Sequence, residues 1–198
     1  LDESVSGMDY RILAQDTSGN WYLGAWTPVT VSDDERPVLD GDDSPVAGAT
    51  GESFTFSARA SDNIGVTAVF VNWGHGALGG NESLTFSAGS WSKAVVLDES
   101  IGDLTYTIYV RDAAANFNIS ALQTVPVVDD EAPSLVADHS AAAGTTGDNF
   151  TINVSVSDNI QVETVWADWS HGASFGNVSL NLTGGFWTAN VTLDESIQ

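Results

Sequence analysis

The sequence predicts an all-β chain made of antiparallel β-sandwich modules, about seven strands each, that repeat in tandem every 96 residues. Three observations lead to this prediction. The tetrapeptide Leu-Asp-Glu-Ser recurs at residues 1–4, 97–100 and 193–196. Apolar and polar side chains alternate with a period of two, which is typical of half-buried strands. No segment has the apolar period of an amphipathic helix.

The repeat extends over the whole chain. Residues 1–96 align with residues 97–192 without a gap, and 41 of these 96 pairs are identical. Pro37 and Pro133 each begin a module, because proline cannot donate to a strand ladder. The chain is therefore divided into the C-terminal strands of one module (1–36), a complete module (37–132) and the N-terminal part of a third (133–198). A β-sandwich module usually has about 100 residues.

The alternation also predicts which side chains of the complete module form its core. The inward rows are Phe54, Phe56, Ala58 and Ala60; Val69, Val71 and Trp73; Leu84 and Phe86; Trp91, Val95 and Leu97; Tyr106, Ile108 and Val110; and Val125 and Val127. Glycine-containing turns such as Thr50-Gly51-Glu52 separate these rows. In the third module the first row recurs as Phe150, Ile152, Val154 and Val156.

The composition excludes several classes of function. The chain has 27 acidic and five basic residues, a formal charge of -22, and such a surface repels nucleic acid. It contains no cysteine, so disulfides and thiolate metal sites are excluded and any metal site must use oxygen ligands. No apolar run reaches the ~20 residues of a membrane-spanning helix. An acidic surface either binds divalent cations or suits high salt, and the clustering of the acidic residues at turns favours ion sites.

Several motifs resemble one known group of repeats. Trp73 lies on the third expected strand, Tyr106 opens the sixth, and Ser-Asp-Asn at 61–63 and Trp-x-His-Gly at 73–76 recur 96 residues later. Over its whole length the chain resembles the tandem immunoglobulin-like (cadherin-like) β-sandwich repeats of archaeal and bacterial extracellular surface, S-layer or filament proteins. The resemblance implies an extracellular location at the cell surface.

Acidic loops supply the candidate metal ligands. In a sandwich of this type, the entry linker, the loop after the second strand and the loop after the sixth strand meet at one pole. These segments carry Asp33, Asp34, Glu35, Asp62, Asn63, Asp112 and Asn116, and in the third module Asp129, Asp130, Glu131, Asp158 and Asn159. Calcium prefers such oxygen ligands, so we expect a structural calcium ion at each junction. The alternative is that the same residues only stabilise turns.

Sequons for N-glycosylation are enriched. Seven of the twelve asparagines begin an Asn-x-Ser/Thr sequence: Asn81, Asn118, Asn149, Asn153, Asn177, Asn181 and Asn190. Asn149 and Asn153 alternate with the apolar row of their strand and point outward, where a glycan does not disturb the core. We therefore expect N-linked glycans.

The sequence does not indicate an enzyme. His75 and His171 recur without a nucleophile spaced beside them, and we interpret them as hydrogen-bond partners within a loop. Phosphate loops, zinc spacings and nucleophile elbows are missing from the sequence. Outward aromatic residues are candidates for subunit contact or for a sugar platform; they are Phe70, Trp166 and Tyr109.

The expected function is structural. We interpret the chain as a repeat region of a glycosylated extracellular filament, surface layer or stalk, with linkers stiffened by cations and with copies of itself or neighbouring surface proteins as partners. One alternative is an adhesin that binds a glycan or a protein through the exposed aromatic residues. The other is a non-catalytic spacer in a large secreted enzyme.

Overall fold

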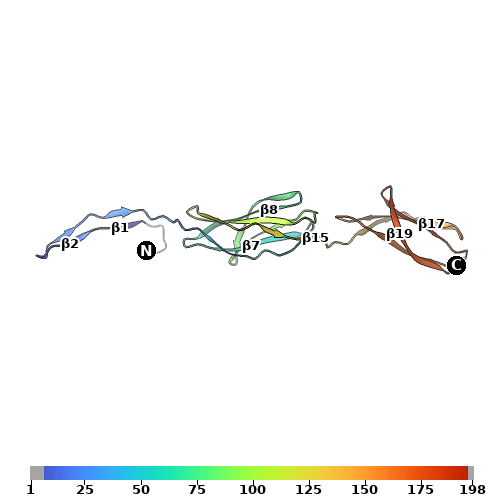
Figure 1. Ribbon diagram of the computed structural model, residues 1–198, viewed down its shortest axis with the longest axis horizontal. Coiled ribbons are helices and arrows are strands. Elements are labelled where there is room, and N and C mark those ends of the chain that lie inside the picture. Colours follow the sequence, from blue (N-terminus) through green and yellow to red (C-terminus); the bar gives the residue numbers. More distant parts are fainter. Residues whose placement is uncertain (1–6, 196–198) are drawn as a thin grey trace. The chain divides into compact units, whose positions relative to one another are not determined.

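The computed structural model describes residues 7–195, and every regular element in this range is a β-strand (Figure 1). The chain divides into two compact units, residues 1–128 and residues 129–198. The described residues contain no helix that could cross a membrane.

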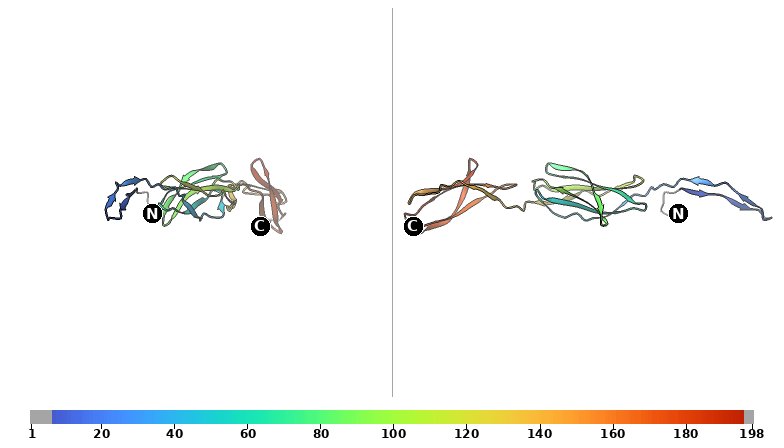
Figure 2. Two further views of the ribbon diagram at one scale, coloured as in Figure 1. Left: turned by 60° about the vertical axis from the view of Figure 1, so that its left-hand side comes forward. Right: turned by 180° about the vertical axis from the view of Figure 1, so that it is seen from behind.

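The complete module consists of two facing sheets. Its strands are β5 (Val38–Asp42), β6 (Gly48–Ala49), β7 (Ser53–Ser61), β8 (Val66–His75), β9 (Leu78–Ser83), β10 (Thr85–Ser87), β11 (Ser90–Val96), β12 (Leu104–Asp112), β13 (Phe117–Ile119), β14 (Gln123–Val125) and β15 (Val127–Val128). One sheet has the order β10-β11-β7-β5. The other has the order β13-β12-β8-β9, with β14 also paired to β12. Figure 2 shows the two layers from behind.

These pieces join into seven chain segments: 38–49, 53–61, 66–75, 78–87, 90–96, 104–112 and 117–128. The fourth segment changes sheets at Leu84, because β9 pairs with β8 whereas β10 pairs with β11. The last segment also pairs in parallel with β6. This strand order is that of an immunoglobulin-like sandwich, so the predicted fold class is confirmed.

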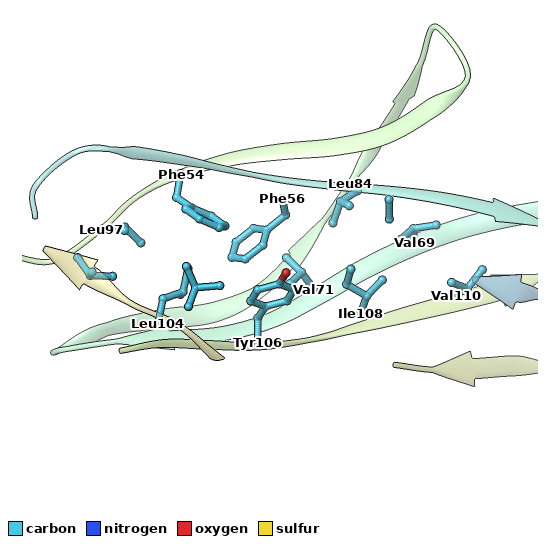
Figure 3. Close-up of a cluster of buried hydrophobic side chains, with 13 residues drawn as sticks. Phe54, Phe56, Val69, Val71, Leu84, Leu97, Leu104, Tyr106, Ile108 and Val110 are labelled. Carbon is cyan, nitrogen blue, oxygen red and sulfur yellow. The ribbon is translucent and has the colours of Figure 1, made fainter. Parts of the chain in front are cut away.

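The core lies between the two sheets (Figure 3). Phe54 and Phe56 point from β7 toward Tyr106 and Ile108 on β12 and Val71 on β8. The rings of Phe56 and Tyr106 meet edge to face at 5.0 Å, a favourable geometry for aromatic pairs. The inward rows predicted from the alternation are buried or packed against this cluster, with one exception.

Phe86 is the exception, and its predicted inward orientation is wrong. Its side chain is 56% exposed and packs against Trp91, with the ring centroids 5.1 Å apart. The reason is the change of sheet at Leu84, which makes β10 the edge strand of its sheet. Phe86 therefore packs sideways along the edge, whereas Leu84 fills the core.

Residues 7–29 form a separate hairpin. Strand β1 (Met8–Tyr10) pairs with β4 (Thr27–Val29), and β2 (Leu13–Gln15) pairs with β3 (Trp21–Leu23). A shift of 96 residues places these strands on β12, β13 and β14 of the complete module. The hairpin therefore has the strand pairing of the last two segments of a module.

The second unit is a single five-stranded sheet. Its strands are β16 (Ser134–Asp138), β17 (Asn149–Ser157), β18 (Val165–His171), β19 (Ser174–Thr183) and β20 (Phe186–Thr192), in the order β16-β17-β20-β19-β18. Strand β19 is continuous, but its neighbour changes after Leu180: residues 174–180 pair with β18, whereas residues 181–183 pair with β20. Only Leu180 and Val191 are fully buried apolar residues among those described in this unit.

Candidate metal centre

Three carboxylates from distant parts of the sequence meet at one pole of the complete module. Asp33 lies in the linker before β5, Asp62 follows β7, and Asp112 ends β12. One carboxylate oxygen from each lies within 4.8 Å of the others. The linker and the two loops therefore converge as the sequence predicts.

Local hydrogen bonds position each carboxylate. Asp62 Oδ2 accepts the backbone N–H groups of Ile64 (2.9 Å) and Gly65 (2.8 Å), which closes the turn after β7. Asp112 accepts from Asn116 twice, through the backbone N–H and through Nδ2, each at 2.8 Å. Asn116 Nδ2 also donates to the carbonyl oxygen of Asp33 at 3.3 Å, so this side chain fastens the linker to the loop.

Buried oxygen atoms remain at this pole without a hydrogen-bond partner. They are Asp33 Oδ2, Asp62 Oδ1 and Asn63 Oδ1. An unsatisfied buried acceptor costs about 1–3 kcal/mol, and more when it is charged. Such atoms are expected where an ion completes the site.

No basic side chain compensates these carboxylates. Within the described range the ion pairs are Arg59–Asp43 (2.7 Å) and Lys93–Glu82 (3.3 Å), so no basic group lies within 4.0 Å of the three carboxylates. Asp112 is almost completely buried. Because like charges at this separation repel, a divalent cation fits the site, and ligands that are all oxygen fit calcium.

Not every predicted ligand reaches this centre. The side chains of Asp34 and Glu35 are exposed and lie outside the group of three. Asn116 Nδ2 donates a hydrogen bond to the Asp112 carboxylate. Asn116 therefore positions this carboxylate and is not itself a member of the group of three. Turn formation uses only one oxygen of Asp62: Oδ2 closes the turn, whereas the buried Oδ1 has no hydrogen-bond partner.

The second unit repeats part of the arrangement. Asp158 Oδ1 accepts from the backbone of Ile160 (3.0 Å) and Gln161 (2.9 Å), as Asp62 does in the complete module. Asp129 Oδ1 accepts from Glu131 N at 3.3 Å, whereas the side chains of Asp130 and Glu131 are exposed. Asn159 is half-buried. The position equivalent to Asp112 would be residue 208, which this sequence does not include.

The N-terminal hairpin contains Asp16, the residue equivalent to Asp112, in a turn of its own. Asp16 accepts from Asn20 through the backbone N–H and Nδ2, each at 2.8 Å, with the geometry of Asp112 and Asn116. These hydrogen bonds lower the pKa of the Asp16 carboxyl group, and the bond from the Asn20 side chain has the largest effect. The turn therefore forms locally, even where its carboxylate is exposed.

The recurring histidine belongs to a clamp between loops. His75 is buried, its Nε2 lies 2.9 Å from the carbonyl oxygen of Gly102, and its Nδ1 accepts from Asp98 N at 3.0 Å. The Asp98 carboxylate in turn accepts from Ala77 N. His171 accepts from Asp194 in the same way at 3.0 Å. This confirms the loop role of the histidine and gives the Leu-Asp-Glu-Ser motif a structural reason. The role of Asp98 could have been inferred from the joint recurrence of the two motifs.

The predicted sequons differ in exposure. Asn81, Asn149, Asn177, Asn181 and Asn190 are exposed, whereas Asn118 and Asn153 are half-buried. Asn118 Nδ2, the atom to which a glycan is attached, donates to the carbonyl oxygen of Pro37 at 3.0 Å. Glycosylation of Asn118 would therefore take place on an atom that holds the start of the module and would leave it a single N–H group to donate.

The outward aromatic residues fall into two groups. Phe70 and Tyr109 are cross-strand neighbours on β8 and β12, and each is half-buried. Trp166 occupies the Phe70 position on β18 but is exposed, because no described strand pairs with that edge of β18. The exposure of Trp166 thus reflects an uncovered sheet edge.

Comparisons with known proteins concern the fold. No family model and no curated protein matches the sequence. Among solved structures, the chain is similar to a chimeric titin Z1Z2 (16% identity, TM-score 0.33, covering 79% of this chain and 81% of that one). It is also similar to the Ig1-2 module of the Drosophila receptor protein tyrosine phosphatase DLAR (12% identity, TM-score 0.36, covering 82% and 85%). The strand order of the complete module itself defines the class, an immunoglobulin-like β-sandwich.

Proposed function

We propose that this chain is a non-catalytic, structural segment of a glycosylated filament, surface layer or stalk on an archaeal or bacterial cell, and that calcium stiffens its module junctions. The observation that carries the proposal is the convergence of Asp33, Asp62 and Asp112, with buried oxygens that lack a partner. Seven sequons and the acidic surface support an extracellular location.

The role of the ion follows from which segments it would join. Asp33 belongs to the linker that enters the module, whereas Asp62 and Asp112 belong to loops fixed by the sandwich. An ion held by all three would fasten the linker to the pole. Without it, the repulsion among the carboxylates would favour a looser linker.

Calcium titration of two adjacent linker variants tests this proposal. Extracellular calcium modules bind with a Kd of ~10⁻⁴–10⁻³ M, so about 10 mM free calcium should stabilise the module by about 1.4–2.7 kcal/mol. For a domain of this size we expect the melting temperature to rise by about 4–8 °C per kcal/mol. Asp33→Asn should lose most of this gain, which differential scanning calorimetry would measure.

Asp34→Asn is the matched control, because its side chain has the same chemistry in the same linker but lies outside the centre. It should keep the calcium response. In a chelator, Asp33→Asn should be at least as stable as the unmodified chain, since one repulsive charge is gone. Equal melting temperatures of the unmodified chain in calcium and in chelator would refute the proposal.

A further inference from the structure

The complete module has apolar side chains on the outer side of one of its sheets. This outer side of the sheet β13-β12-β8-β9 is called the apolar face below. The register places Ile119 opposite Tyr109 and Tyr109 opposite Phe70, and in the next row Phe117 lies opposite Arg111. Ile119 is 45% exposed and Phe117 is 57% exposed. An antiparallel sheet that faces water normally has polar side chains on that side, so this face is unusual.

The apolar character of these positions recurs in the repeat. At four outward positions the two copies in the sequence have different residue types, but every one of them is apolar or aromatic. The pairs are Phe70 and Trp166, Tyr109 and Leu13, Phe117 and Trp21, and Ile119 and Leu23. None of the four residues of the complete module belongs to its core cluster, so packing inside the module does not explain them. Apolar residues gathered on an outer face indicate a contact with another molecule.

The outer side of the other sheet, β10-β11-β7-β5, has a different composition. On β7 and β11 its outward residues are mainly hydroxyl residues, namely Ser53, Thr55, Ser57, Ser61 and Ser92. Sequon asparagines occupy equivalent outward positions in the second unit, and they are Asn149, Asn153, Asn181 and Asn190. The apolar face has one sequon asparagine among its outward residues, Asn81 on the edge strand β9. The hydroxyl side therefore suits water and glycans, whereas the apolar face suits a packed contact.

The charges of the apolar face indicate the kind of partner. None of the outward residues that the register gives for β8, β9, β12 and β13 is an aspartate or a glutamate. Arg111 is the one charged residue among them, although the chain has 27 acidic and five basic residues. A face that binds a basic partner would carry carboxylates to attract it. A face without carboxylates instead allows a second strongly acidic molecule to approach, because no like charges meet inside the contact.

We propose that the apolar face is a contact between two copies of this chain, which pack sheet to sheet about a two-fold axis. The matching surface must be apolar and free of carboxylates. Among the outer sheet faces described for the complete module, the apolar face meets both conditions, so each copy uses the same face. Tyr109 lies near the centre of the contact and Asn81 at its margin. The proposal takes its partner, another copy, from the proposed structural function, but it uses none of the three carboxylates of the metal centre.

Sedimentation velocity of the unglycosylated chain in a chelator tests this contact separately from calcium binding. Tyr109→Glu should weaken the dimer at least about a hundredfold, because it places like charges from both copies inside the contact. Ile119→Glu should act in the same direction at a more exposed position, where the fold tolerates the change. Thr55→Glu is the matched control, since it adds the same charge to the outer side of the other sheet and should leave the dimer nearly unchanged. Near-ultraviolet circular dichroism would verify that the variants keep the folded module.

Cross-linking tests the two-fold arrangement, because the chain has no native cysteine. Asn72→Cys places one thiol at an exposed position of the apolar face, and Thr55→Cys places one at an exposed position of the other sheet. In a face-to-face dimer the two Asn72 positions lie on the same side of each partner's contact. With a short bifunctional maleimide, Asn72→Cys should therefore give covalent dimers much faster than Thr55→Cys.

The salt dependence distinguishes a second copy from a basic partner. Association should become tighter between 0.1 M and 1 M sodium chloride, because the Debye length falls from about 10 Å to about 3 Å and the repulsion between the acidic chains is screened. A contact held by opposite charges would weaken instead. A chain that stays monomeric at about 1 mM in 1 M salt would overturn the proposal. So would association that neither glutamate substitution on the apolar face weakens, or equal cross-linking of the two cysteine variants.

Discussion

The complete module and the second unit have nearly the same sequence pattern, yet their interiors differ. Phe56 is fully buried between two sheets, whereas Ile152 at the equivalent position is half-exposed on one sheet. Val69 and Val71 on β8 are fully buried, but their counterparts on β18 are not. Strands β7, β8 and β11 have the counterparts β17, β18 and β20, whereas no described strand of the second unit lies at the position of β12.

An apolar row of side chains along a strand does not by itself form a buried core. Alternation gives each strand an apolar face, and pairing with its neighbours gives it a place in a sheet. Burial of a whole row requires a second layer of side chains opposite the first. In the complete module β12 supplies that opposite surface, and Tyr106 fills its centre.

The largest expected effect is on the free energy of unfolding, and it distinguishes the interior of the complete module from that of the second unit. Phe56→Ala should lower the unfolding free energy of the complete module by about 3–5 kcal/mol, as for other buried aromatic residues. Ile152→Ala should cost less than about 2 kcal/mol, because this side chain already contacts water. Urea denaturation measures both costs. Equal costs for the two substitutions would mean that the second unit has a closed core of its own.

The smallest effect concerns the bond that ties β12 to β5. Tyr106→Phe removes the donor to Asp42 and should cost about 1 kcal/mol at neutral pH. Burial, together with the Asp42 carboxylate, raises the pKa of Tyr106 to about 12 from its ordinary value of 10.0.

The sign of the pH effect follows from the raised pKa. The hydroxyl is more stable as the neutral form in the folded module, so its contribution is complete below pH 10.0 and is lost as the pH rises through about 12. The stability difference between the unmodified chain and Tyr106→Phe should therefore shrink over this range. Urea denaturation of both chains across this pH range measures the difference.

Much of the candidate centre could be predicted from the sequence because its turns are local. Asp16 with Asn20 and Asp112 with Asn116 form the same hydrogen bonds in very different surroundings. Which members of the acidic linker take part could not be predicted. Asp33, Asp34 and Glu35 are chemically similar, and only the path of the linker against the two loops selects Asp33.

The sequence by itself determined the all-β class, the repeat and the inward rows, because alternation and turn residues act over a few residues. The tertiary structure decided the position of Phe86, since the change of sheet at Leu84 depends on which neighbour each half of that segment pairs with. It also decided how deeply the inward rows of the complete module are buried. Their burial depends on β12, a strand from farther along the chain, which a local pattern does not encode.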